Sequence, residues 1–316
     1  MSLPVRRAFS LVELLVVIAI VALLIGLLVP ALSQARAFAR TTRSQANIRS
    51  NAQIALVYAN ENAETFPNPF SAKNDASLGP SQNQDWVWVP GQEGKLGWVY
   101  GDSEAGSTSG TESFGYHWLA HLLYSDQTAA SRIETLIAPG DDSLRTWLRT
   151  NNDRGAQGEA NWIFPSSYWY SPVFWQVPER FATLFPETPT RSNNYLIRRN
   201  KISDCLAPGK KVLLFENRDF QSPTQPMWNE ATARPNVALV DGSVLRVRMA
   251  DIIASTATTA VAGPGELDLP SGKWQPGVTE MGLRFLYGPQ QGFNWQMGKP
   301  AYFWRTRQGV HGRDIP

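Results

Sequence analysis

Residues 6–32 read RRAFSLVELLVVIAIVALLIGLLVPAL and form the longest apolar stretch of the chain. The run Leu14–Leu32 contains no charged residue over 19 positions. As a helix it would be roughly 28 Å long, about the thickness of the hydrocarbon core of a bilayer. Glu13 stands at its start, although a carboxylate at mid-membrane costs about 2.5–3.5 kcal/mol. Cleavage after Ala8 would provide it with a partner, because it creates an α-amino group on Phe9, four residues away.

The order Arg-Arg-Ala-Phe-Ser-Leu-Val-Glu before an apolar stretch resembles the class III signal of type IV pilins and type II secretion pseudopilins. The resemblance implies that a prepilin peptidase/methyltransferase cleaves between Ala8 and Phe9, and that Phe9 is then N-methylated. Ala8 replaces the usual Gly. Glu13 matches the glutamate that pairs with the amino terminus of a neighbouring subunit during assembly. Pro30 stands where many pilins carry a proline.

Three other interpretations of this segment stay open. A secretory signal peptide would use the small-residue site Ser33-Gln34-Ala35, but its apolar core is normally 7–15 residues long and carries no glutamate. Arg6-Arg7 resembles a twin-arginine signal, whose core is usually less apolar. The third interpretation is a membrane anchor that is never cleaved. Four arginines follow the span and two precede it, so the positive-inside rule alone places the C-terminal side in the cytoplasm. The leader motif favours the opposite orientation.

Composition favours an exported protein that binds no nucleic acid. The chain has 316 residues, with 29 Lys and Arg against 27 Asp and Glu. Removal of residues 1–8 makes the two counts equal, whereas nucleic-acid binders carry a basic patch or stripe. Cys205 is the single cysteine, which excludes an internal disulfide and a cysteine-based zinc site.

The helix is expected to continue beyond the apolar run as an amphipathic helix over residues 33–63. The segment Ser33–Asn60 contains neither Gly nor Pro. Small or apolar residues recur on one face at helical spacing, which lets a sheet approach closely: Ile48, Ala52, Ala55 and Ala59. Arginines recur on another face, where they meet solvent, anionic lipid headgroups or acidic residues of a neighbouring subunit: Arg36, Arg40 and Arg43.

Residues after Ala63 predict loops and then an antiparallel sheet. Phe66-Pro67-Asn68-Pro69 ends the helix. Strands are predicted from β-branched and aromatic content at residues 194–197 and 211–215, and a short helix at residues 117–136. In NVALVDGSVLRV, residues 236–247, Asp-Gly between apolar runs predicts a hairpin with a type I′ turn. This hairpin and residues 58–67 resemble large pseudopilin-like proteins.

The predicted fold class is α+β, a long N-terminal helix with a membrane half and an amphipathic half packed on an antiparallel β-sheet, with large loop-rich insertions. The predicted divisions follow the chain: a leader at 1–8, a transmembrane or filament-core helix at 9–32, an amphipathic helix at 33–63, a globular domain at 64–249 with an insertion at about 70–190, and a C-terminal extension at 250–316.

The sequence contains no recognisable catalytic motif, and no enzyme activity is expected. His117 and His121 have the i, i+4 spacing of zinc ligands, but no glutamate lies between them, so the HExxH pattern is absent. No cofactor is expected. Calcium is the one alternative, because the resemblance to major pseudopilins implies a calcium site in a C-terminal loop. The candidate ligands are Asp141-Asp142 with Asp153, or Asp241, and none has EF-hand spacing.

Aromatic residues gather between prolines in residues 161–185, including Trp162, Trp169 and Trp175. Exposed rings of this kind stack on sugars, which suggests a glycan-binding surface, whereas buried rings would fill the core of a loop-rich domain. The resulting interpretation is a pseudopilin-like subunit in the bacterial inner membrane, with a single span and a periplasmic or extracellular domain. Its partners would be the processing enzyme, other subunits, the assembly platform and membrane lipid. The alternative is an anchored glycan-binding module that does not polymerise.

Overall fold

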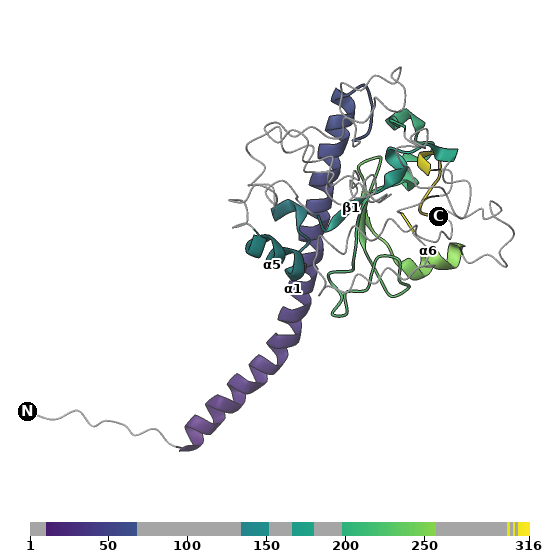
Figure 1. Ribbon diagram of the computed structural model, residues 1–316. Helices are drawn as coiled ribbons and strands as arrows, with labels where there is room; N and C mark the ends of the chain where they lie inside the picture. Colours follow the sequence, from purple (N-terminus) through teal and green to yellow (C-terminus); the bar gives the residue numbers. More distant parts are fainter. Residues whose placement is uncertain are drawn as a thin grey trace, which may run out of the picture. The chain divides into compact units, whose positions relative to one another are not determined.

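A single helix, α1 (Leu11–Glu61), opens the part of the chain that the structure describes (Figure 1). The computed structural model describes residues 11–67, 134–151, 166–179, 198–256, 302–303, 306 and 309–316. The chain divides into two compact units, Met1–Arg43 and Ser44–Pro316, and the boundary falls inside α1. The second unit also holds α5 (Asp142–Asn151), α6 (Met249–Thr256) and the short 3-10 turns η2 (Pro172–Phe174), η5 (Ile202–Asp204), η6 (Pro208–Lys210) and η8 (Gly309–His311).

The predicted continuity of the N-terminal helix is confirmed. α1 contains Pro30 in its interior and shows no interruption between its apolar and polar halves. The helix ends at Glu61, close to the predicted end at Ala63. Ala63 and Glu64 both adopt left-handed backbone conformations, with φ of 54° and 63°. These two residues turn the chain so that the Phe66 N–H donates to the Asn200 carbonyl over 3.0 Å. The turn therefore comes before the prolines that the sequence offered as the stop signal.

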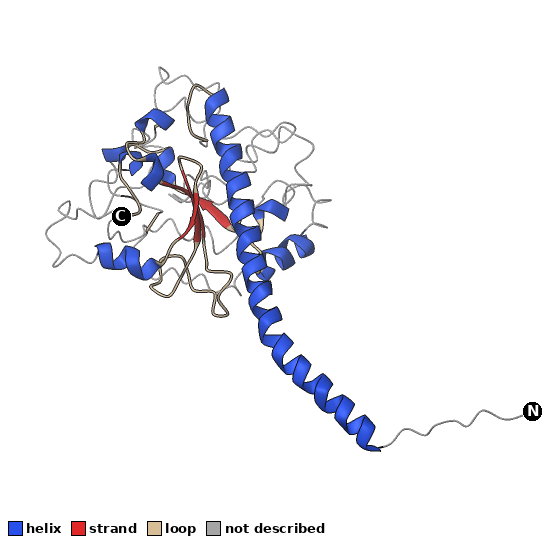
Figure 2. Ribbon diagram, turned by 180° about the vertical axis from the view of Figure 1, so that it is seen from behind, coloured by secondary structure: helices blue, strands red, loops and turns tan. Residues whose placement is uncertain are grey.

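Four antiparallel strands form one sheet, in the order β1-β2-β3-β4 (Figure 2). The strands are β1 (Tyr168–Tyr170), β2 (Val212–Glu216), β3 (Asn236–Leu239) and β4 (Val244–Arg246). The α+β class and the strands predicted at residues 211–215 and 236–247 are confirmed. The strand predicted at residues 194–197 lies outside the described residues, as does residue range 117–133 of the predicted short helix.

The turn of the β3–β4 hairpin differs from the predicted type I′ turn. The Gly242 N–H donates to the Leu239 carbonyl over 3.0 Å, and the Leu239 N–H donates to the Ser243 carbonyl over 2.9 Å. Gly242 has φ of +84°, whereas Asp241 does not have positive φ. This pattern is a type I turn followed by a left-handed glycine, the usual form of a three-residue hairpin loop. The Asp241 carboxylate accepts hydrogen bonds from the Ser243 N–H (2.8 Å) and hydroxyl (2.6 Å), which favours this turn.

The two faces of the sheet have different packing partners. In Figures 1 and 2 the C-terminal part of α1 runs alongside the strands. Its buried residues are those predicted from helical spacing, together with two polar ones: Ser44, Ile48, Asn51, Ala52, Ala55 and Ala59. Strand alternation directs Tyr168 and Glu216, which are paired across β1 and β2, toward this helix. The intervening pair, Trp169 and Phe215, therefore points to the opposite face.

An aromatic cluster covers that opposite face. Trp169 and Trp228 make an edge-on contact with centroids 5.0 Å apart, and Phe215 lies 5.5 Å from Trp228 and 5.7 Å from Phe303. The Trp228 indole N–H donates to the Tyr302 carbonyl over 2.7 Å. Tilted and edge-on ring pairs add stabilisation beyond the area they bury. These contacts tie residues 302–303 into the core.

Two segments outside the strands predicted from sequence contribute to the core of the second unit. β1, within the predicted insertion at 70–190, is a buried strand of the sheet. Several residues of the predicted C-terminal extension are buried in the second unit as well: Tyr302, Phe303, Thr306, Val310 and Asp314. Contacts between segments far apart in sequence place both segments there.

A buried ion pair secures the end of the chain to the start of β2. The Lys211 ammonium lies 3.3 Å from the Asp314 carboxylate, and both side chains are fully buried. Lys211 also donates to the Thr306 hydroxyl (2.7 Å) and the Gly309 carbonyl (2.8 Å). Asp314 accepts from the Val212 N–H over 2.9 Å and from the Thr306 hydroxyl. Burial lowers the pKa of Lys211 and raises the pKa of Asp314, while their mutual attraction opposes both shifts.

We expect Asp314→Asn to destabilise the domain by about 3–5 kcal/mol, because it leaves the buried Lys211 charge without its counter-ion. The measurement is denaturant unfolding of the full chain in detergent, followed by tryptophan fluorescence. The double variant Lys211→Met/Asp314→Leu removes both charges and should cost less than Asp314→Asn alone. A double variant whose loss equals the sum of the losses of Lys211→Met and Asp314→Leu would show that the charges do not interact.

Gly140→Ala is expected to destabilise more than Gly242→Ala, although both glycines have positive φ. A Cβ at Gly140 would lie 2.7 Å from the Phe220 carbonyl oxygen, whereas one at Gly242 meets only Leu56 at 4.0 Å. Gly242→Ala should therefore cost about 1–2 kcal/mol for the left-handed backbone alone. Gly140→Ala should cost about 3 kcal/mol or more. The same unfolding assay tests this, and equal losses would contradict the packing argument.

Candidate functional site

The apolar half of α1 is the first candidate functional feature. Every residue from Leu11 to Arg40 is exposed, including the large aliphatic side chains of the apolar run. Among the described residues, α1 is the one helix that is long and apolar enough to cross a membrane. Apolar patches of this size on a protein surface mark contact with lipid or with another protein. The first unit therefore presents an apolar helix that requires such an environment.

Glu13 lies in the first turn of α1, with its side chain exposed. No other acidic residue occurs in the helix until Glu61 at its last position. The N-terminal end of a helix carries partial positive charge, which stabilises an acidic residue placed there. Ala8 and Phe9 lie outside the described residues, so their proposed cleavage and the pairing of Glu13 with an amino terminus stay predictions. Pro30 lies in the helix interior, and its part in assembly is likewise a prediction.

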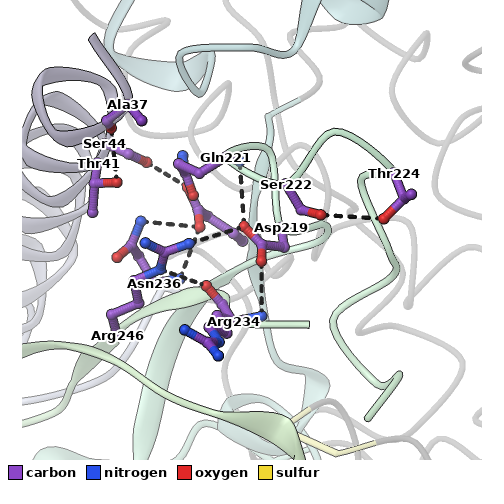
Figure 3. Close-up of polar contacts among 11 residues, drawn as sticks. Ala37, Thr41, Ser44, Asp219, Gln221, Ser222, Thr224, Arg234, Asn236 and Arg246 are labelled. Atoms are coloured by element: carbon purple, nitrogen blue, oxygen red, sulfur yellow. Dashed lines mark hydrogen bonds and ion pairs between the residues drawn. The ribbon is translucent and has the colours of Figure 1, made fainter. Parts of the chain in front are cut away.

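A buried carboxyl group joins α1 to the sheet at the start of the second unit. The Ser44 hydroxyl of α1 donates to Glu216 Oε1 over 2.5 Å and lies 3.0 Å from the Tyr168 hydroxyl. Asn236 of β3 donates to Glu216 Oε2 through its backbone N–H (2.8 Å) and its side-chain amide (3.0 Å). In Figure 3, dashed lines mark the hydrogen bonds that the side chains of Ser44 and Asn236 make with this carboxyl group. The carboxyl group thus links β2 to α1 and β3, and the Ser44 hydroxyl extends the contact to β1.

Burial raises the pKa of Glu216 from 4.5 to about 7, because desolvation disfavours the carboxylate. Hydrogen bonds from Asn236 and Ser44 lower it only in part. The same burial raises the pKa of Tyr168 well above its usual value, and the Glu216 charge adds to this shift. Glu216 therefore ionises near neutral pH, while Tyr168 keeps its proton. The Ser44 hydroxyl can donate to the carboxylate or accept from the carboxylic acid.

A second carboxylate, Asp219, lies beside this group and is fully satisfied by hydrogen bonds (Figure 3). Its oxygens accept from the Arg234 N–H (3.1 Å) and the Gln221 N–H (3.2 Å), and the Arg246 guanidinium lies 3.2 Å away. Arg246 also donates to the Arg234 carbonyl over 3.0 Å. This network fixes the loop between β2 and β3 against β4. Asp219 has a cationic partner, in contrast to Glu216, which accepts hydrogen bonds from the neutral groups of Ser44 and Asn236.

The structure contradicts the proposed glycan contact for two of the three tryptophans. Trp169 and Trp175 are 0% exposed, so neither ring has a free face on which a sugar could stack. Trp169 belongs to the aromatic cluster on the sheet, and Trp175 stacks on Tyr170 with centroids 5.1 Å apart. Trp169 and Trp175 instead fill the core, as the alternative interpretation of these rings predicted. Trp162 lies outside the described residues.

The residues considered for metal binding are not brought together where the structure describes them. Asp141 caps the N-terminus of α5, accepting from the Leu144 N–H (3.0 Å) and the Ser167 hydroxyl (2.7 Å). Asp142 is exposed beside Arg145, and Asp241 belongs to the hairpin turn. Within the described ranges, no group of three or more His, Cys, Asp or Glu residues forms a metal site. His117, His121 and Asp153 lie outside these ranges.

Sequence reasoning did not identify the Glu216 group. One signal was available, because Glu216 ends the otherwise apolar strand VLLFE and charged residues are rarely buried without partners. Ser44 and Tyr168 gave no comparable signal. They lie 172 and 48 positions from Glu216, and only folding places them together.

We expect Glu216→Gln to reduce the pH dependence of stability. The folded-state pKa of Glu216 is raised, so its contribution is fully present below pH 4.5 and is lost as pH rises through about 7. A Gln side chain stays neutral, so the variant should not show this loss of folding stability, which is on the order of 3 kcal/mol. Urea unfolding of the full chain in detergent, measured on both sides of this window, tests the expectation.

Asp142→Asn provides the matched control, because it removes a carboxylate whose side chain is 88% exposed. This variant should keep the pH dependence of the wild-type chain. If Glu216→Gln also keeps that dependence, Glu216 is ionised throughout the window and the argument from burial is wrong.

Comparison with known proteins identifies the N-terminal segment alone. Residues 4–29 match the family model described as the prokaryotic N-terminal methylation motif. No curated protein and no solved structure matches the chain. The matched residues include Ala8, Phe9 and Glu13 and extend over most of the apolar half of α1. The chain therefore carries the prepilin-type signature of type IV pilins and pseudopilins.

Proposed function

We propose that this chain is a pseudopilin-like structural subunit of a type II secretion or type IV pilus-like filament. The observation that carries the proposal is the coincidence of the methylation motif at residues 4–29 with an exposed apolar helix. In this proposal a prepilin peptidase/methyltransferase cleaves between Ala8 and Phe9 and methylates the new amino terminus. The processed chain then polymerises through α1.

The physical basis of polymerisation is that α1 needs an apolar environment both before and after assembly. The bilayer supplies it to the single subunit, and the helices of neighbouring subunits supply it in the filament. Moving between the two environments exposes little apolar surface to water. Assembly therefore replaces the contacts of α1 with lipid by contacts of α1 with the helices of neighbouring subunits.

Glu13 gives this exchange its specificity. A carboxylate surrounded by apolar side chains is costly unless a positive charge accompanies it. The amino terminus of Phe9 on a neighbouring subunit supplies that charge only when the two helices have the correct axial offset. The pair therefore selects one register between subunits, while the aliphatic residues alone would allow many.

The proposal includes a location and further partners. The subunit is inserted once in the bacterial inner membrane, with residues 1–8 in the cytoplasm and the second unit in the periplasm or in an extracellular filament. An inner-membrane assembly platform and other pilin or pseudopilin subunits are its partners. The globular domain has a structural role and catalyses no reaction.

Glu13→Ala is expected to abolish incorporation into filaments while membrane insertion and cleavage remain. The measurement is the amount of the subunit in sheared filament fractions relative to membrane fractions, with mass spectrometry of the mature amino terminus. Glu61→Ala is the matched control, because Glu61 is also an exposed acidic residue of α1 but lies at the opposite end. It should leave incorporation unchanged.

Three results would contradict the proposal in different ways. Normal incorporation of Glu13→Ala would refute the role of this carboxylate. A mature chain that keeps Met1 would leave only a membrane anchor, as in the non-polymerising alternative. A start near Arg36 would identify a secreted protein, because the apolar segment would have been removed.

A further inference from the structure

Three arginines form a band on α1 directly after its apolar run, and we call Arg36, Arg40 and Arg43 the arginine collar. Their spacing of four and three residues places them on one face of the helix. All three side chains are exposed, and Phe38 between them is 75% exposed. The whole collar belongs to the first unit of the chain.

The charge of this part of α1 has one sign. No acidic residue occurs between Glu13 and Glu61, so every charged side chain of the helix over this stretch is positive. Removal of residues 1–8 would also take away Arg6 and Arg7 on the other side of the span. The arginine side chains that flank the span are then confined to its C-terminal side, which favours an anionic partner there.

The depth of the collar identifies that partner. At 1.5 Å per residue, Arg36 lies roughly 6 Å, Arg40 roughly 12 Å and Arg43 roughly 16 Å beyond Leu32, the end of the apolar run. The headgroup region occupies about 5–8 Å on each side of the hydrocarbon core, and arginine side chains extend back toward it along their aliphatic stems.

We propose that the arginine collar binds the phosphate groups of anionic phospholipids in the leaflet around the C-terminal end of the span. The guanidinium group suits this role, because it donates two parallel hydrogen bonds to phosphate oxygens. The inference rests on the membrane-spanning part of the proposed function and is independent of polymerisation. It adds a headgroup preference to a segment otherwise defined by its hydrophobicity.

The test uses the full chain reconstituted into nanodiscs of phosphatidylcholine mixed with phosphatidylglycerol. The protein is extracted in mild detergent, and the ratio of the two co-purified lipids is measured by mass spectrometry. Wild type should retain phosphatidylglycerol above its proportion in the nanodisc. The variant Arg36→Gln/Arg40→Gln/Arg43→Gln should retain the bulk ratio, with a change of roughly fivefold per arginine at low salt.

Two further variants separate charge from structure. Arg36→Lys/Arg40→Lys/Arg43→Lys keeps the charge and should keep most of the enrichment. Arg49→Gln removes an arginine of the same helix that lies roughly 25 Å beyond Leu32, and it should leave the lipid ratio unchanged. Since all these side chains are exposed, the near-ultraviolet circular dichroism of the buried tryptophans should not change.

The outcomes distinguish this inference from the proposed function. A chain that enters nanodiscs but shows equal lipid ratios in wild type and the Gln variant overturns the inference alone. A Gln variant that keeps its lipid enrichment but loses co-sedimentation with a second copy assigns the collar to an acidic surface of the neighbour, which also overturns it. A chain that does not enter nanodiscs contradicts the membrane span itself.

Discussion

The contact between the Ser44 hydroxyl and the Glu216 carboxyl determines how α1 lies on the sheet. Ser44 of α1 and Asn236 of β3 donate to this carboxyl group, and Tyr168 of β1 joins the network through its contact with the Ser44 hydroxyl. Apolar packing of small residues permits many neighbouring placements of a helix, since it has little directional preference. A buried carboxyl group permits few such placements, because each hydrogen bond that it fails to form lowers the stability of the fold. The polar contact therefore gives the apolar interface one register.

The opposite face of the sheet depends on a different principle. Trp169, Phe215 and Trp228 cover it with aromatic surface, and Phe303 completes the layer from the end of the chain. The strands are only three to five residues long and present little surface of their own. Large rings compensate for this, because each buries more area than an aliphatic side chain. The buried Lys211–Asp314 pair then ties the last residues to β2.

The two units of the chain thus have opposite relations to apolar surface. The second unit buries the aromatic residues that cover its sheet, while the first exposes its aliphatic residues along the helix. That contrast is what the proposed function requires. The described core of the second unit holds its own aromatic residues, and the apolar helix remains available to a bilayer or to other subunits. Trp169 and Trp175, which were predicted as part of a binding surface, belong to that core.

The sequence predicted the features that depend on local pattern. Uninterrupted hydrophobicity and the leader motif identified α1 and its prepilin-type segment, since both are properties of adjacent residues. Helical spacing identified the buried alanines, and Asp241-Gly242 located the hairpin. The turn type differed, because an Asp-Gly pair is compatible with two hairpin loops. The structure selected the loop in which Gly242 alone is left-handed.

Only the tertiary structure decided the features that join distant segments. Nothing near Glu216 in sequence shows that Ser44 and Tyr168 will surround it, and nothing near Trp169 shows that Trp228 will cover it. The residues after position 300 likewise had no local pattern that assigned them to the core. By itself, the sequence determined that this chain carries an apolar helix with one acidic residue at its start, because hydrophobicity and charge are properties of single residues. Which carboxyl groups and rings are withdrawn from water was decided by folding, because burial depends on every segment that packs against a residue.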